Sequence, residues 1–171
     1  MCKNFEIELL SNDHTRNGFD CGEVALNKYI KSSVDLDIKK YLTRCYVSIE
    51  ENNNIIIGYY TLSNHAIAID TLPKSRSRKI PPGYSSVGTI LLGRLAIDLN
   101  YQNLGLGKYL LVDSIKRSLS AARISQAYAI ITHAKNETAA KFYEHYGFLP
   151  LRDNKQHLYL PMKTAEKIFT D

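Results

Sequence analysis

A near-continuous apolar run, Thr89–Asp98, constrains the fold of this chain more than any other segment. Its β-branched residues are typical of a strand buried in the centre of a sheet. A glycine-bearing loop, Asn100–Gly107, follows directly, and apolar residues at helical spacing continue over Leu106–Ala122. The sequence therefore predicts a buried strand, a loop and a helix in immediate succession.

The loop of this unit has the chemistry of a phosphate site. Gly105 and Gly107 predict a sharp turn that leaves backbone N–H groups uncovered, next to the positive end of the helix dipole. Gln102 can brace the loop or contact a phosphate. A Gly-x-Gly pair is weak by itself, because two glycines also suit a plain tight turn. The spacing excludes a Walker loop and the Gly-x-Gly-x-x-Gly loop of dinucleotide folds.

The remaining segments predict an α/β domain in which strands first pair as hairpins and then alternate with helices. Further strands are expected at residues 5–9, 44–50, 55–63, 127–132 and 158–160. Asp20 is expected to cap a helix that begins near Cys21, with an apolar stripe at Val24, Leu26, Tyr29 and Ile30. A second helical stretch should reach about residue 41, and others should cover 136–145 and 163–169. Residues 73–86 predict a long loop of the kind that is often functional.

Composition places the chain among ordinary globular domains. It has 171 residues, 44% of them hydrophobic, which suits one domain with a sizeable core and excludes disorder. A net charge of +5 fits an anionic partner such as a CoA phosphate or RNA. The three cysteines form no disulfide or metal pattern, and no signal peptide or membrane span is visible. A reducing, cytoplasmic setting is therefore expected, and no metal site is predicted.

A second stretch of candidate functional residues, Asn136–Phe148, follows after one more predicted strand. Small residues after Asn136 allow a ligand chain to lie close to this helix. Of the aromatic residues near its end, Phe142 and Phe148 are expected in the core. Tyr143 differs, because a buried phenol hydroxyl needs a hydrogen-bond partner.

Gln102-x-x-Gly105-x-Gly107 after a strand, with Asn136 and Phe142-Tyr143 downstream, resembles the GNAT acetyltransferases. The resemblance covers nearly the whole chain. It implies one GNAT domain over residues 1–171, with a central mixed, mostly antiparallel sheet that is flanked by helices and splayed at the acetyl-CoA site. It also implies acetyl-CoA as co-substrate, with pantetheine on the backbone of the central strand, pyrophosphate on the glycine loop and Tyr143 beside the sulfur. The implied acetyl-CoA-binding residues are Leu95, Ala96, Ile97, Gln102, Asn103, Leu104, Gly105, Leu106, Gly107, Lys108, Asn136, Ala139 and Phe142.

A narrower resemblance is to the GNAT toxins of type II toxin–antitoxin modules. It is carried by Phe19–Gly22, Gly58–Leu62, Ile90–Asp98 and Leu158–Met162. It implies acetylation of the amino group of aminoacyl-tRNA, a block of translation, a ribbon-helix-helix antitoxin and a homodimer. Where such toxins commonly carry glycine and a basic residue, this chain has Asn103 and Leu104.

In this reaction an amine attacks the thioester, and a backbone N–H near Ala96 or Ile97 can stabilise the developing oxyanion. Tyr143 would then serve the leaving thiolate as general acid. A free α-amino group has a pKa of about 7.7–8.0, and the amine of an aminoacyl ester should be less basic still. Much of it is then neutral at pH 7, and no general base is assigned. His133 and His145 are more typical of structural or solvated histidines.

Basic residues in the 73–86 loop suit either a solvated face or the phosphates of tRNA. Arg94, in mid-strand, either fixes the sheet or faces the substrate. The tRNA-binding candidates are Lys74, Arg76, Arg78, Lys79 and Arg94. Two alternatives stay open: a GNAT enzyme that acetylates a small or protein amine, and a non-catalytic GNAT-fold binding module. Retention of Tyr143 argues against the second, and the basic loop argues against cationic small substrates.

Overall fold

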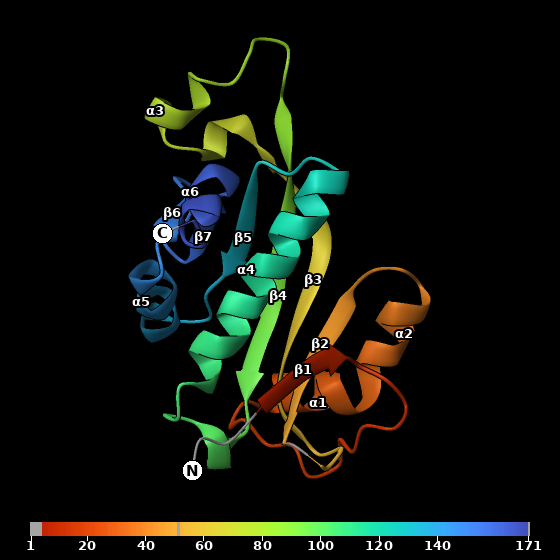
Figure 1. The fold of residues 1–171 in the computed structure, drawn as a ribbon. Helices are drawn as coiled ribbons and strands as arrows, with labels where there is room; N and C mark the ends of the chain where they lie inside the picture. The colour runs from red at the N-terminus through yellow and green to blue at the C-terminus, as the bar shows by residue number, and fades with distance from the viewer. Residues whose placement is uncertain (1–4, 51, 171) are drawn as a thin grey trace. The chain divides into compact units, whose positions relative to one another are not determined.

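The computed structural model describes residues 5–50 and 52–170 (Figure 1). Within them, strands are hydrogen-bonded in one seven-stranded sheet with the order β1-β2-β3-β4-β5-β7-β6. The strands are β1 Phe5–Leu9, β2 Arg44–Glu50, β3 Ile56–Ala68, β4 Ser86–Ile97, β5 Ala129–His133, β6 Leu149–Pro150 and β7 His157–Pro161.

Helical segments follow β1, β3, β4, β5 and β7. The α-helices are α1 Val24–Lys28, α2 Val34–Lys39, α3 Lys74–Ser77, α4 Leu106–Ile124, α5 Glu137–His145 and α6 Met162–Lys167. A π-helical turn, η1 Tyr29–Ser33, joins α1 to α2, and the 3-10 turns are η2 Ile69–Thr71 and η3 Leu99–Tyr101. None of the helices in the described residues is both long and apolar enough to cross a lipid bilayer.

The sheet is mixed and mostly antiparallel, as expected. β1 pairs antiparallel with β2, β2 with β3, β5 with β7 and β6 with β7, whereas β4 and β5 are parallel. The parallel ladder joins Thr89–Leu92 of β4 to Ala129–Thr132 of β5. β4 then continues to Ile97, whereas β5 ends at His133. The expected α/β architecture is confirmed, and β4 continues beyond the end of its ladder with β5.

Most strand predictions hold to within a residue or two, and the exceptions have physical reasons. β1 and β2 have the predicted bounds, but β3 runs on to Ala68 although polar Ser63 and Asn64 interrupt its apolar pattern. Backbone pairing, not side-chain polarity, decides where that strand ends. β6 was not predicted because a two-residue strand carries no periodicity.

The chain groups into two compact units. The first comprises residues up to Ser63 together with Arg94–Ser114, and the second comprises Asn64–Gly93 and residues from Ile115 onward. In the first unit, the core is built from η1, α2 and strands β2 and β3. Its fully buried members include Phe19, Ile30, Val34, Cys45, Val47, Ile56 and Tyr59.

Tyr59 shows how that core satisfies its polar groups. Its ring packs against Phe19 at a centroid distance of 5.5 Å, and its hydroxyl donates to the Leu26 carbonyl at 2.8 Å. A buried aromatic side chain contributes about 1.5–3 kcal/mol, provided that its polar atom finds a partner.

In the second unit, a separate core joins β5 and β7 to the segment between β3 and β4. Its buried members are Ile67, Leu72, Ala129, Ile131, Leu151 and Tyr159. Leu72 lies just before α3 and is fully buried, so this core holds the segment that carries the basic residues.

The prediction that Asp20 caps a helix near Cys21 is wrong. α1 begins at Val24, and the Asp20 carboxylate instead accepts hydrogen bonds from the Gly22 N–H at 2.9 Å and the Asn27 amide at 2.7 Å. Val24, expected in the apolar stripe, is 83% exposed, whereas Tyr29 and Ile30 are buried. Gly22 has a φ of +84°, so the chain turns there instead of starting a helix.

Residues 73–86 are only partly a loop, because α3 lies within them. Cys21 and Cys45 are buried thiols outside any disulfide, and burial raises the pKa of Cys45 to about 12. Cys2 lies outside the described residues.

Gly58 of β3 marks a close approach that a side chain would disturb. A Cβ there would meet Cδ1 of Ile97 and of Leu110 at 3.0 Å each. Gly58→Val should therefore lower the free energy of unfolding by about 1–3 kcal/mol, measured by urea denaturation. Gly18→Ala, where a Cβ meets nothing within 4 Å, is the control and should leave it nearly unchanged. Equal stability of both variants would show that Ile97 and Leu110 can move aside to make room for a larger side chain at position 58.

Candidate functional site

The phosphate loop, residues 102–108, connects η3 to α4 with two residues in the left-handed backbone region. Asn103 has a φ of +61° and Gly105 a φ of +82°. Asparagine is among the few side chains that tolerate this region, so Asn103 takes a conformation that glycine would otherwise supply. Gly107, expected at a second sharp turn, lies in the first turn of α4.

Two polar side chains hold this loop to its surroundings. The buried Asp98 carboxylate accepts from the backbone N–H groups of Asp20 and Asn100, each at 3.0 Å. The Gln102 amide donates to the carbonyls of Ile97 at 3.0 Å and Cys21 at 3.2 Å. Of the two roles considered for Gln102, bracing the loop is the one observed.

The loop presents backbone donors to solvent. Gln102, Asn103, Leu104 and Gly105 are exposed, whereas Leu106 is buried and anchors the start of α4. The first N–H groups of an α-helix have no acceptor within the helix, and the dipole of the 19-residue α4 adds positive potential at this end. Lys108 is exposed in the same turn. The arrangement can bind a phosphate or pyrophosphate.

The end of β4 supplies a further backbone surface. Leu95, Ala96 and Ile97 lie beyond Leu92, the last residue of the parallel ladder with β5. Ala96 is buried, and Leu95 and Ile97 are half-buried. An edge of extended backbone outside a ladder can pair with the amide groups of a bound chain.

Arg94 lies in the same strand and is held by an aromatic ring. Its guanidinium carbon lies 3.5 Å from the centroid of Tyr29, a cation–π contact. The Tyr29 hydroxyl in turn donates to Asp37 at 3.0 Å. This contact fixes Arg94 within the first unit, in line with the structural alternative for this residue.

In the second unit, Tyr143 is only 8% exposed, and its hydroxyl is hydrogen-bonded to Thr132. The Thr132 hydroxyl donates to the Leu92 carbonyl at 3.0 Å, so its oxygen accepts from the phenol. These contacts place the Tyr143 hydroxyl at the last rung of the β4–β5 ladder. Burial raises the pKa of Tyr143 above its ordinary value, so the phenol keeps its proton at neutral pH.

Aromatic packing fixes the Tyr143 ring. Phe142 lies at a centroid distance of 5.2 Å and Phe148 at 5.5 Å, with Phe148 fully buried as expected. Asn136, a predicted ligand residue, caps α5, since its side-chain oxygen accepts from the Ala139 N–H at 2.8 Å. The short side chain of Ala139 is half-buried. The helix that presents Tyr143 is therefore fixed at both ends.

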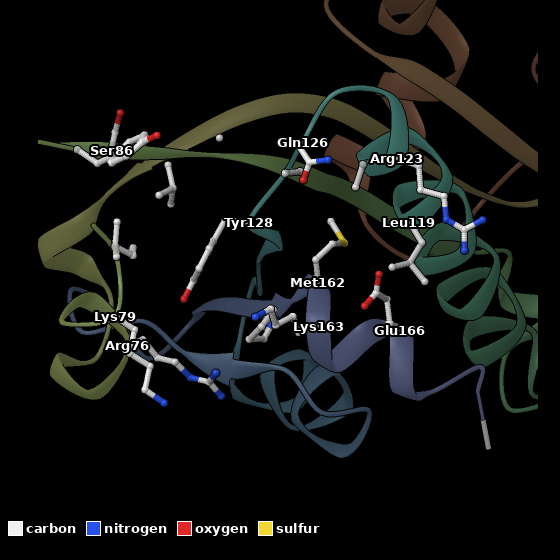
Figure 2. A pocket seen from close by; sticks show the side chains of 17 residues that line it. Arg76, Lys79, Ser86, Leu119, Arg123, Gln126, Tyr128, Met162, Lys163 and Glu166 are labelled. Atoms are coloured by element: carbon white, nitrogen blue, oxygen red, sulfur yellow. The ribbon is translucent and has the colours of Figure 1, made fainter. Parts of the chain in front are cut away.

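A basic hollow of about 710 Å³ lies within the second unit (Figure 2). Figure 2 shows Arg76 and Lys79 on one side of it, Arg123 on the other, and Tyr128, Met162 and Lys163 between them. Among its lining residues Glu166 is the one carboxylate, against four cations. Lys74 and Arg78, the other cations of α3 and its end, are exposed but do not line the hollow.

Sequence reasoning did not find every member of these sites. Arg123 and Lys163 stand alone in the sequence, at the end of α4 and the start of α6, and only the fold brings them to the basic hollow. Thr132 closes an apolar strand and carries no motif. His65, His133 and His157 stand on three different strands but lie together.

In the part of the chain that the structure describes, no group of three or more His, Cys, Asp or Glu residues is arranged to hold a metal ion. His14, buried near the start of the chain, pairs with Glu8 at 2.6 Å.

Comparison with known proteins gives this geometry a family context. The acetyltransferase (GNAT) domain family matches residues 43–150. A tRNA-acetylating toxin from Mycobacterium tuberculosis is 33% identical over 153 residues, which cover 90% of this chain and 89% of the relative.

Solved structures are similar over almost the whole chain. AtaT complexed with acetyl-methionyl-tRNAfMet has a TM-score of 0.90 and 32% identity, covering 98% of this chain and 100% of that chain. A tyrosine-to-phenylalanine mutant of the toxin AtaT, bound to acetyl-CoA and the C-terminus of the antitoxin AtaR, has a TM-score of 0.82 and 28% identity, with 98% and 99% covered.

The left-handed backbone at Asn103 yields a test of the loop. Asn103→Val should lower the free energy of unfolding by about 1–2 kcal/mol, because a β-branched side chain is strained at positive φ. Asn103→Gly should be neutral or slightly stabilising at the same position. Urea denaturation of both variants measures the difference. A valine variant as stable as the glycine variant would mean that the loop adopts another backbone.

Proposed function

Because the chain belongs to the GNAT acetyltransferase family, we propose that it transfers the acetyl group of acetyl-CoA to the amino group of an aminoacyl-tRNA. A cell that expresses it alone then loses charged tRNA for translation, so the protein acts as a toxin. The observation that carries the chemistry is the buried, protonated hydroxyl of Tyr143, held at the last rung of the β4–β5 ladder. The substrate class follows from the similarity to tRNA-acetylating toxins.

The phosphate loop is assigned to the pyrophosphate of acetyl-CoA. Its exposed backbone donors and the positive end of α4 supply the binding energy, with Lys108 as the nearby cation. The backbone of Leu95, Ala96 and Ile97 is assigned to the amides of pantetheine, by the same β-type pairing that joins strands. One of these backbone N–H groups also stabilises the oxyanion. Asn136, Ala139 and Phe142 are assigned to the same ligand on the strength of the family motif.

Tyr143 is assigned to the departing sulfur. A phenol is a weaker acid than a thiol, and burial of Tyr143 weakens its acidity further, so the hydroxyl stays protonated in the ground state. As the C–S bond breaks, negative charge builds on sulfur, and the hydroxyl supplies a hydrogen bond and then the proton. Thr132 holds the hydroxyl in place until that step.

The basic hollow and α3 are assigned to the tRNA phosphates. Four cations against one carboxylate create a positive surface that attracts a polyanion and repels polyamines or aminoglycosides. This charge favours tRNA over small cationic amines as the acceptor. The assigned residues are Lys74, Arg76, Arg78 and Lys79 from the sequence, and Arg123 and Lys163 from the structure. Arg94, which Tyr29 holds in the first unit, is not assigned to the tRNA phosphates.

A small antitoxin is the protein partner in this proposal. The support is the similarity to a toxin bound to the C-terminus of its antitoxin. That the antitoxin is of the ribbon-helix-helix type, and that the enzyme is a cytoplasmic homodimer of single-domain chains, follows from the family resemblance.

Tyr143→Phe tests the proposed function, because it keeps the ring and removes only the hydroxyl. General acid catalysis is worth roughly 10²–10⁴-fold, so acetylation of charged tRNA by purified protein should fall by about that factor. Binding of acetyl-CoA should hardly change, and expression of the variant without antitoxin should be tolerated.

Tyr146→Phe is the matched control, since that ring lies in the same helix end without the Thr132 contact. It should acetylate like the parent. A parent protein that acetylates no charged tRNA overturns the function, and a Tyr143→Phe variant of parental activity overturns the role of the hydroxyl.

The basic hollow has its own test. Reversing two of its cations, with Arg76→Glu and Lys163→Glu together, should weaken tRNA binding and reduce the slope of log affinity against log salt by about 1 for each phosphate that is no longer neutralised. Lys155→Glu with Lys167→Glu changes the net charge equally at exposed positions outside the hollow. If both pairs lower the salt slope alike, the effect is one of net charge and the assignment of the hollow fails.

A further inference from the structure

Three histidines from three strands lie together in the second unit. His133 of β5 is directly opposite His157 of β7 in the antiparallel ladder, and their ring centroids are 4.2 Å apart. The ring of His65, from β3, lies 6.1 Å from that of His133 in an edge-on arrangement. The Asp153 carboxylate is 3.1 Å from Nδ1 of His157.

His133 directly follows the last paired residue of β5 in the parallel ladder with β4. The parallel ladder ends with Leu92 opposite Thr132, and Gly93 and His133 are the next residues of the two strands. Gly93 has no side chain and is exposed, as is His133. The imidazole of His133 is therefore exposed just beyond the last rung of this ladder.

The Tyr143 hydroxyl and the His133 side chain lie on opposite faces of the sheet at the end of this ladder. Successive side chains of a strand point to opposite faces of the sheet. Thr132 points to the face of the Tyr143 hydroxyl, to which it is hydrogen-bonded, so the adjacent His133 points to the other face. A thioester bound at this end of the ladder would thus have a proton donor on one side and an imidazole on the other.

The surroundings of His133 keep its imidazole neutral. Partial desolvation, followed by the neighbouring His157 and His65, lowers the pKa of His133 below its ordinary value, and Asp153 acts in the opposite sense. These are the titratable groups that face it, from β7, β3 and the turn before β7. Below its lowered pKa the ring is charged and cannot take a proton; above it, and so at neutral pH, the ring is a free acceptor.

We propose that His133 is the general base of the reaction, which takes the proton from the attacking amino group on the face of the sheet opposite Tyr143. The proposal rests on the proposed function and adds a catalytic residue to it. His65 and His157 are positioning residues that set the orientation and charge state of His133.

The step balances as a direct transfer. The lone pair of the amine nitrogen forms the C–N bond to the acetyl carbonyl carbon, and the proton that this nitrogen loses goes to the His133 imidazole. The C–S bond breaks, its electron pair leaves with sulfur, and sulfur takes the proton of the Tyr143 hydroxyl. Solvent returns a proton to Tyr143 and removes one from His133, so the products are the amide and free CoA.

The pH dependence of acetylation distinguishes a base from a structural histidine. With acetyl-CoA and charged tRNA, log kcat/KM of the parent should fall on the acid side in two stages, one for the substrate amine and a second for His133. His133→Gln should lower kcat by about 100-fold and remove the second stage, while the thermal shift caused by acetyl-CoA persists. A purely structural role would lower the rate equally at every pH and leave both stages in place, which overturns the proposal.

Two further variants make the outcome decisive. His157→Gln removes a neighbour that lowers the pKa of His133, so the second stage should move to higher pH; an unmoved stage overturns the proposal even if His133→Gln does not fold. His145→Gln, an exposed histidine outside the cluster, is the control and should keep the parental profile. If the parent acetylates charged tRNA and His133→Gln matches it, the base assignment falls and the function stands. If the parent acetylates none, the function itself falls.

Discussion

The buried carboxylate of Asp98 is the constraint on which the phosphate loop depends. It closes β4, where its own N–H donates to Ile57 at 2.9 Å, and its oxygens tie down the backbone of Asp20 and the first turn of η3. A buried carboxylate is costly unless donors surround it, so this position can exist only with the turn and the loop both in place. Gln102 joins the same segments from the loop, because its amide donates to the Ile97 and Cys21 carbonyls. Together they allow exposed backbone at Asn103 and Gly105 to hold one conformation at the start of α4.

The proposed acid–base chemistry depends on a second constraint, the short parallel ladder between β4 and β5. It ends at Leu92 and Thr132, so β4 carries Gly93–Ile97 onward without that partner. Because successive side chains of a strand alternate, the Thr132 hydroxyl and the His133 imidazole lie on opposite faces of the sheet. One face has a phenol that keeps its proton, and the other has an imidazole that stays without one. In the proposed mechanism, these opposite pKa shifts suit the phenol to the role of acid and the imidazole to the role of base.

The fold and the Tyr143 helix could be predicted from the sequence because their signals are local. The apolar run of β4, the glycine loop and the Asn136 cap each lie in a few consecutive residues, and β1 and β2 were found at their observed bounds. The failures were cases where a distant group decides the outcome. The sequence predicts Asp20 as a helix cap, but its carboxylate instead accepts hydrogen bonds from Gly22 and Asn27 in a turn. His133 reads as a solvated histidine because His65 and His157 come from strands that are far apart in the chain. Arg123 and Lys163 join the basic hollow in the same way, through tertiary structure alone.

The hydrogen bond between Tyr143 and Thr132 has a direction, and that direction matters when no acceptor amine is present. The Thr132 hydroxyl already donates to the Leu92 carbonyl, so the phenol must point its own hydrogen at Thr132 while it rests. In the proposed reaction, a thioester bound beside this hydroxyl therefore receives no proton while the hydrogen is held by Thr132. The sulfur becomes a better acceptor than the threonine oxygen only after an attacking amine has begun to break the C–S bond. If Tyr143 has the proposed role, its resting hydrogen bond thus withholds acid catalysis from attack by water and reserves it for attack by the amine.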